Sequence, residues 1–239
     1  MNVSASFDTV EDSTTSRAEK ARLAVYDFDG TCITGNSPVM LVKHLYRDDL
    51  LSIKQALDIC LWAVRYKFRL PQNESSVRAK VFRPFEGRPK ADVDEYLRLF
   101  YDEVVCPCWR PAAIASMNER KAEGCHIMVV SASWQAIVDR AREERGFDCA
   151  LATNMIVDEA GNYTRQVEGL PVEGTEKLRV IQRYADNRFG AGNWELSYAY
   201  GDHHSDRALL SAATNAFAVT PDKPLARTAR SCKWPILEW

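Results

Sequence analysis

The second half of the chain alternates between short apolar runs and amphipathic stretches, and no other feature constrains the fold as strongly. Helical spacing is found in residues 134–145 and 174–189, each of which separates two apolar runs. Alternating strands and helices are typical of a parallel sheet with helices on both faces. The runs that we interpret as strands are LAVY (23–26), HIMVVSAS (126–133), CALATNM (149–155), LSYAYGD (196–202), NAFAVT (215–220) and WPILEW (234–239). The sequence therefore predicts an α/β fold.

Two segments depart from this alternation. Residues 38 to about 105 carry only helical patterns, which predicts an all-helical insertion after the first strand. Within it we expect amphipathic helices over residues 50–64 and 92–105, and a further helix follows over 109–123. The sequences MIVDE and NYTRQVEG flank Ala160-Gly161-Asn162 and predict a β-hairpin. The polar, acidic residues 1–20 are interpreted as a disordered tail.

Composition narrows the functional classes. The net charge of −2 gives no overall basic field for nucleic acid. The seven cysteines form no CxxC pair and have no regular spacing, which predicts neither a disulfide framework nor a cysteine zinc site. We read Cys106 and Cys108, which flank a proline, as thiols of a reducing compartment, and we predict a cytoplasmic protein. The most apolar helical stretch, 50–64, is interrupted by Lys54 and Asp58 and is too short for a bilayer span. We therefore expect no nucleic-acid partner and no stable membrane insertion, while the oligomeric state stays open.

Acidic and polar side chains follow the predicted strands at the edge where ligands bind in open α/β sheets. The stretch LAVYDFDGTC places Asp27 and Asp29 directly after the first strand. The other side chains that we expect at this edge are Ser131 and Ser133, Lys177 near the start of a helix, Asp202, and Asp206 a few residues further on. Four converging carboxylates would repel one another, and a hard dication such as Mg²⁺ relieves that repulsion. The sequence therefore predicts a magnesium site suited to phosphoryl transfer.

The spacing of Asp27 and Asp29 fits a two-step reaction. One carboxylate can attack phosphorus and form an aspartyl-phosphate. The second, two residues on, projects the same way in extended chain and can act as general acid and then general base. Gly30 permits a sharp turn, and Thr31 adds a hydrogen-bond donor.

These motifs together resemble the haloacid dehalogenase superfamily. DFDGT, VVSAS, a lysine before a helix and GDHHSD occur in that family's order, and the similarity is greatest to subfamily IB, the phosphoserine phosphatase-like hydrolases. The resemblance implies a Rossmann-like core (21–36 and 110–239) with a helical cap (37–109). It implies that Asp27 is the nucleophile and Asp29 the general acid/base. Ser131, Ala132 and Lys177 would hold the phosphoryl group, and Asp27, Asp29 (through its carbonyl), Asp202 and Asp206 would bind or support Mg²⁺.

Two departures from the family pattern bear on specificity. Asn36 stands where phosphoserine phosphatases carry the glutamate that meets the substrate amino group, and we expect Asn36 to face the substrate. The alternative is that Asn36 caps the next helix. His203 stands where a small residue is usual. Adjacent side chains rarely bind one ion, so we do not expect His203 and His204 to share a metal. We expect His203 to lie at the rim or contact the substrate, and His204 to be packed or solvated. Arg78 aligns only loosely with the arginine that reads serine.

The sequence therefore predicts a magnesium-dependent phosphomonoesterase that acts on a small phosphorylated metabolite. Two alternatives would use the same site, a phosphotransferase or mutase and a lipid head-group phosphatase, the latter hinted at only by the basic-aromatic RYKFRL (65–70). A catalytically silent interaction module is a further class, which the presence of both Asp27 and Asp29 disfavours.

Overall fold

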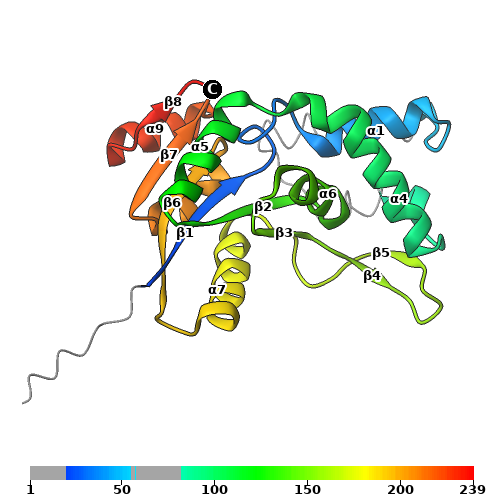
Figure 1. Cartoon of the computed structure of the whole chain (residues 1–239). Helices are drawn as coiled ribbons and strands as arrows, with labels where there is room; N and C mark the ends of the chain where they lie inside the picture. Colours follow the sequence, from blue (N-terminus) through cyan, green and yellow to red (C-terminus); the bar gives the residue numbers. More distant parts are fainter. Residues whose placement is uncertain (1–19, 55–56, 58–81) are drawn as a thin grey trace, which may run out of the picture.

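The computed structural model describes residues 20–54, 57 and 82–239. Its centre is a six-stranded sheet, which Figure 1 shows with helices packed around it. The strand order is β3-β2-β1-β6-β7-β8, and all neighbouring strands are parallel. The strands are β1 (Ala21–Asp27), β2 (His126–Trp134), β3 (Cys149–Thr153), β6 (Trp194–Gly201), β7 (Asn215–Val219) and β8 (Ile236–Leu237). The predicted parallel α/β fold is confirmed.

Helices cover both faces of the sheet because the side chains of the central strand alternate between two cores. Ala24 and Tyr26 belong to the core under α5 (Pro111–Ala122) and α6 (Gln135–Arg145). Leu23 and Val25 belong to the core under the helices of the opposite face. Those helices are α7 (Thr175–Phe189), α8 (Arg207–Ala212) and α9 (Lys223–Cys232). No helix was predicted between NAFAVT and WPILEW, so α9 is an addition to the sequence-based expectation.

The described part of the segment after the first strand consists of helices joined by turns. It contains α1 (Ser37–Arg47), the short turns η1 (Arg83–Phe85) and η3 (Cys106–Cys108), and α4 (Lys90–Phe100), which continues into the π-helical turn η2 (Tyr101–Val105). The helix predicted over 92–105 is thus divided in two. Leu45 and Phe100 of this segment share one continuous core with Ile137 of α6. The division into a cap (37–109) and a core domain therefore stays a prediction.

The predicted hairpin is present as β4 (Met155–Val157) and β5 (Tyr163–Val167), which pair antiparallel. Asp158 closes its turn, since its Oδ1 accepts from the amides of Ala160 and Asn162 at 3.0 and 2.8 Å. The Tyr163 hydroxyl donates to Asp94 Oδ1 of α4 at 2.7 Å. The hairpin thereby joins the helical segment to the sheet.

Several predictions concern residues outside the described ranges. They are the tail up to residue 19, most of the helix predicted over 50–64, the RYKFRL segment and Arg78. Among the described residues, no helix combines the length and the apolar character that crossing a bilayer requires.

Candidate active site

The register of the sheet brings the predicted site residues to one edge. Asp27, the last residue of β1, pairs with Val130 of β2, so Ser131 lies one step beyond it. On the other side Tyr26 pairs with Tyr200 of β6, which places Asp202 just past the strand end. Parallel strands present their carboxyl ends on the same side, and acids from distant parts of the sequence therefore meet there.

Asp27 is held by a buried ammonium group. Lys177 Nζ of α7 donates to Asp27 Oδ1 at 2.7 Å and to Asp206 Oδ1 at 2.6 Å. All three side chains are almost inaccessible to solvent, with exposed fractions of 9% for Asp27, 4% for Lys177 and 0% for Asp206. A single cation thus compensates two buried carboxylates, and the fixed geometry orients Asp27 at the end of its strand.

Asp202 completes a group of carboxylates, which we call the carboxylate cluster: Asp27, Asp202 and Asp206 each offer an oxygen within 4.8 Å of the others. The Thr31 hydroxyl donates to Asp202 Oδ1 at 3.3 Å. Position 30, which faces Asp202, requires glycine. Its φ is +80°, and a Cβ there would collide with the carboxylate of Asp202.

The electrostatics of the cluster fit a hard dication. Burial raises the pKa of Asp27 to about 6, and Lys177 opposes the shift. Burial, with the nearby charges of Asp27 and Asp206, raises the pKa of Asp202 to about 9. For Lys177 burial favours the neutral form, but Asp206 and Asp27 outweigh it and raise the pKa of the ammonium group. Three carboxyl groups lie beside a single ammonium group. A bound dication such as Mg²⁺ would compensate the negative charge that the ammonium group does not.

Asp29 is the second acid of the DFDGT motif, and the start of α1 holds it. The backbone amide of Ser37 donates to Asp29 Oδ1 at 2.5 Å. Burial nevertheless raises the pKa of Asp29 to about 7. A carboxyl group that titrates near neutral pH can both give and take a proton.

Serine hydroxyls form a buried network beside this edge. Ser131 Oγ accepts from the amide of Ser133 at 3.0 Å, and the hydroxyls of Ser133 and Ser37 lie 2.7 Å apart. Ala132, between the two serines, accepts through its carbonyl from the Thr153 hydroxyl at 3.1 Å. The network joins the end of β2 to the start of α1, and so connects the strand end predicted to hold a phosphoryl group to the helical segment.

Asn36 caps the next helix, which is the alternative to a contact with substrate. It is exposed and forms the N-cap of α1, where its Oδ1 accepts from the amide of Val39 at 3.1 Å. Its predicted contact with substrate stays a prediction.

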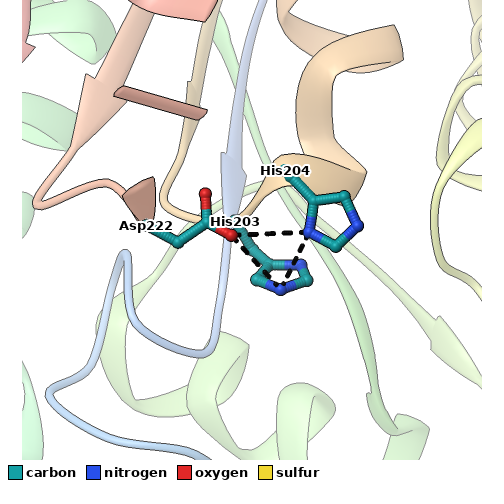
Figure 2. Close-up of side chains that lie close together, drawn as sticks. All are labelled: His203, His204 and Asp222. Carbon is teal, nitrogen blue, oxygen red and sulfur yellow. Dashed lines mark hydrogen bonds and ion pairs between the residues drawn. The ribbon is translucent and has the colours of Figure 1, made fainter. Parts of the chain in front are cut away.

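The rings of His203 and His204 converge on one carboxylate, whereas we expected His203 at the rim or on the substrate and His204 packed or solvated. Figure 2 shows both rings directed at Asp222, with Oδ2 of Asp222 3.6 Å from His203 Nε2 and 3.4 Å from His204 Nδ1. The two imidazole nitrogens are 3.1 Å apart. We call these three residues the histidine cluster.

Sequence reasoning did not single out Asp222. Two signals could have found it: Asp222 follows a predicted strand at the ligand-binding edge, and Asp-Lys-Pro is typical of a helix start. Asp222 does cap α9, since its Oδ1 accepts from the amide of Leu225 at 2.7 Å.

The parallel sheet with helices on both faces defines a Rossmann-like α/β fold, and its buried carboxylates and lysine lie where such folds bind ligands. The sequence pattern of the haloacid dehalogenase-like hydrolase family matches residues 24–211, and the chain belongs to that family. The prediction that it is an enzyme, a hydrolase of this family, is thereby confirmed.

Two curated relatives carry phosphatase names. A probable phosphatase of Mycobacterium tuberculosis is 28% identical over 93% of this chain and 77% of its own length. A histidinol-phosphatase of Neisseria meningitidis is 23% identical over 91% of this chain and 98% of its own.

Solved structures share the fold. A Bordetella pertussis protein of unknown function superposes with a TM-score of 0.81 at 21% identity, covering 92% of this chain and 99% of that one. A phosphoserine phosphatase structure, described as a phospho-aspartyl intermediate analogue, gives 0.61 at 21% identity, with coverage of 92% and 93%. These likenesses confirm the fold that the sequence motifs predicted.

Proposed function

We propose that the protein is a magnesium-dependent phosphomonoesterase that acts on a small phosphorylated metabolite through an aspartyl-phosphate. The observation that carries this proposal is the arrangement around Asp27. Its carboxylate is buried and held by Lys177 at 2.7 Å, next to the oxygens of Asp202 and Asp206 and two residues before Asp29. The phosphatase names of the relatives support the same reaction class.

In the first step an oxygen of Asp27 attacks phosphorus. The new bond joins Asp27 to the phosphoryl group, and the bond between phosphorus and the ester oxygen breaks. The departing alkoxide takes a proton from Asp29, whose pKa of about 7 leaves it partly protonated at neutral pH.

In the second step Asp29, now a carboxylate, takes a proton from water. The resulting hydroxide attacks phosphorus, the bond to Asp27 breaks, and inorganic phosphate leaves. Both carboxyl groups return to their starting protonation, so the cycle consumes one water and one phosphate ester.

Other groups at this edge of the sheet would stabilise the negative charge on the phosphoryl oxygens. Mg²⁺, when bound by Asp27, Asp202 and the carbonyl of Asp29, with Asp206 in support, supplies positive charge that stabilises the phosphoryl oxygens. Lys177, Ser131 and the backbone at Ala132 bind and orient the same group. The buried serine network fixes the position of Ser131 and Ala132 at the end of β2.

The substrate that we favour is a small ester of a primary alcohol. The names histidinol-phosphatase and phosphoserine phosphatase both denote enzymes for such esters. Asn36 replaces a glutamate of the phosphoserine enzymes, so we expect no strong preference for a substrate amino group. The free thiols among the described cysteines fit a cytoplasmic enzyme.

The proposal is tested by phosphate release from an aryl phosphate in Mg²⁺. We expect turnover that EDTA abolishes and that Asp27→Asn lowers by about 10³-fold or more. Acid quenching with ³²P-labelled substrate should trap label on the wild-type chain and none on Asp27→Asn. Undiminished turnover in Asp27→Asn would refute the nucleophile. Formation of a phosphorylated acceptor alcohol in place of inorganic phosphate would indicate a phosphotransferase.

The role of Asp29 is tested with two leaving groups. A nitrophenolate leaves without a proton, whereas an alkoxide needs one. Asp29→Asn should therefore slow the first phosphoryl transfer by about 10²–10⁴-fold for an alkyl phosphate and much less for nitrophenyl phosphate. Because later hydrolysis also needs Asp29, the first step is measured in a single turnover. Equal losses for the two esters would contradict the general-acid role.

A further inference from the structure

The histidine cluster lies at the same sheet edge as the carboxylate cluster, but the proposed phosphatase mechanism uses none of its residues. His203 and His204 follow β6 directly, and Asp222 stands between β7 and α9. The side chains are about one-third exposed, at 34%, 27% and 28% for His203, His204 and Asp222. They therefore line a part of the rim that solvent reaches.

The distances within the histidine cluster are those of a tetrahedral metal site. The three donor atoms are separated by 3.1, 3.4 and 3.6 Å. Four ligands at the usual zinc bond length of about 2.0–2.1 Å are separated by about 3.3 Å along each edge of the tetrahedron. We propose that His203 Nε2, His204 Nδ1 and Asp222 Oδ2 form a binding site for Zn²⁺, whose fourth position faces solvent and takes water or one donor atom of a small molecule.

Hydrogen bonds fix two of the three ligands from outside. Asp222 uses Oδ1 to cap α9 at 2.7 Å from the amide of Leu225, so Oδ2 is the oxygen directed at the imidazoles. Its backbone amide donates to the carbonyl of Asp202 at 2.8 Å, which ties the loop after β7 to the loop after β6. Outer contacts of this kind orient metal ligands.

Ser205 holds the ring of His203 from its other side. Its hydroxyl lies 3.0 Å and its amide nitrogen 3.4 Å from His203 Nδ1. In the metal-free chain the Ser205 amide donates to Nδ1, which places the ring proton of His203 on Nε2, toward His204. When zinc binds, that proton moves to Nδ1, which then donates to the Ser205 hydroxyl and leaves the lone pair of Nε2 directed at the other two donors. Zn²⁺ then takes the place of the proton that links the two imidazoles in the metal-free chain.

The donor types separate this site from the carboxylate cluster. Two imidazoles and one carboxylate suit Zn²⁺ and similar transition metals, whereas three carboxylates suit Mg²⁺. The two clusters are joined through the backbone, since the His203 amide donates to Asp206 Oδ2 at 3.2 Å. A zinc ion would therefore add positive charge at the rim of the proposed active site. Its binding is measured without substrate and does not depend on the phosphatase reaction.

The test is a zinc titration of the full chain against a chromophoric chelator, in excess Mg²⁺ to fill the carboxylate cluster. We expect one Zn²⁺ per chain. His204→Ala and Asp222→Asn should each weaken binding by at least about tenfold. Asp222→Asn is a sharp variant because asparagine also caps helices, so it removes the charge and retains α9. Unchanged affinity in both variants, or no zinc bound by the wild type, overturns the proposal.

Three matched variants localise the ion. His126→Gln alters a histidine at the start of β2, and Cys106→Ser alters a thiol of the helical segment; neither should change zinc affinity. Asp202→Asn should also leave it unchanged, and loss of zinc in that variant with retention in His204→Ala would place the ion in the carboxylate cluster instead.

If a variant fails to fold, the visible absorption spectrum of Co²⁺ bound to the wild-type chain tests the site instead. Tetrahedral Co²⁺ in the histidine cluster should produce intense visible bands without thiolate charge transfer, whereas a weak octahedral spectrum alone would contradict the site.

Discussion

The carboxylate cluster and the histidine cluster share one edge of the sheet and yet differ in burial and in charge compensation. Asp27 and Asp206 are buried and have an ammonium group, Lys177, between them. His203, His204 and Asp222 are partly exposed and include one carboxylate that faces two imidazoles. Both clusters form because the carboxyl ends of parallel strands lie at one edge of the sheet. They differ in burial, and the more deeply a charged group is buried, the more the stability of the fold depends on its charged partner.

The largest expected effect is on the free energy of unfolding, and it concerns the carboxylate cluster. Lys177→Met should lower the free energy of unfolding by about 3–5 kcal/mol, because two buried carboxylates lose their cation. Lys43→Met, an exposed change in α1, should move it by less than about 0.5 kcal/mol. Chemical denaturation of both variants measures the difference.

A double variant sharpens this prediction. Adding Asp206→Asn to Lys177→Met removes one uncompensated charge, so the double variant should be more stable than the two separate losses would give. Strict additivity would show that Lys177 and Asp206 do not depend on one another.

The next effect concerns pH without divalent cations. The folded chain keeps protons on Asp27, Asp29 and Asp202 up to about pH 6, 7 and 9, whereas the unfolded carboxyls lose theirs near pH 4. Since the folded state then binds more protons than the unfolded state, its stability falls as pH rises between these values. We expect the melting temperature to drop by several degrees from about pH 5 to about pH 8, which scanning calorimetry can follow.

Asp202→Asn provides the control for this pH effect. The amide is neutral without binding a proton, so folding of the variant requires no proton uptake at this position, and without metal it should melt higher than the wild type at about pH 8. Mg²⁺ should raise the melting temperature of the wild type more than that of the variant. A pH-independent melting temperature in both proteins would contradict the raised pKa values of the buried carboxyl groups.

The smallest effect concerns the rim. Ser205→Ala should weaken zinc binding by about tenfold, because it frees the ring of His203 to turn. Thermal stability should change little, since the side chain is partly exposed. A large loss of stability with unchanged zinc affinity would assign Ser205 to the fold and not to the metal site.

Much of this arrangement could be predicted because hydrophobic periodicity locates parallel strands, and their ends locate the acids. The adjacent positions of Asp27, Ser131, Asp202 and Asp206 follow from strand order alone, although their chemical roles stay predictions. The convergence of His203 and His204 could not be foreseen. His203 is extended (φ −111°, ψ 151°) and His204 begins a 3₁₀ turn, and this change of backbone brings neighbouring rings together.

Other features escaped because the sequence pattern does not distinguish them. Tyr101 and Val105 are both buried, so the apolar spacing continues past Phe100 although the α-helix changes there to a π-helical turn. The helix α9 has few apolar residues; Leu225 and Ala229 are its buried positions, and its start is signalled only by Asp222 and Pro224.

The pairing of β1 has a consequence for synthesis of the chain. Asp27 meets Val130 and Tyr26 meets Tyr200, so the central strand acquires its second neighbour only after about five-sixths of the residues have been added. Until then at least one edge of this apolar strand stays unpaired, and open strand edges are prone to aggregate. Production of this protein in cells should therefore respond strongly to chaperone supply and to translation speed, more than its final stability alone would indicate.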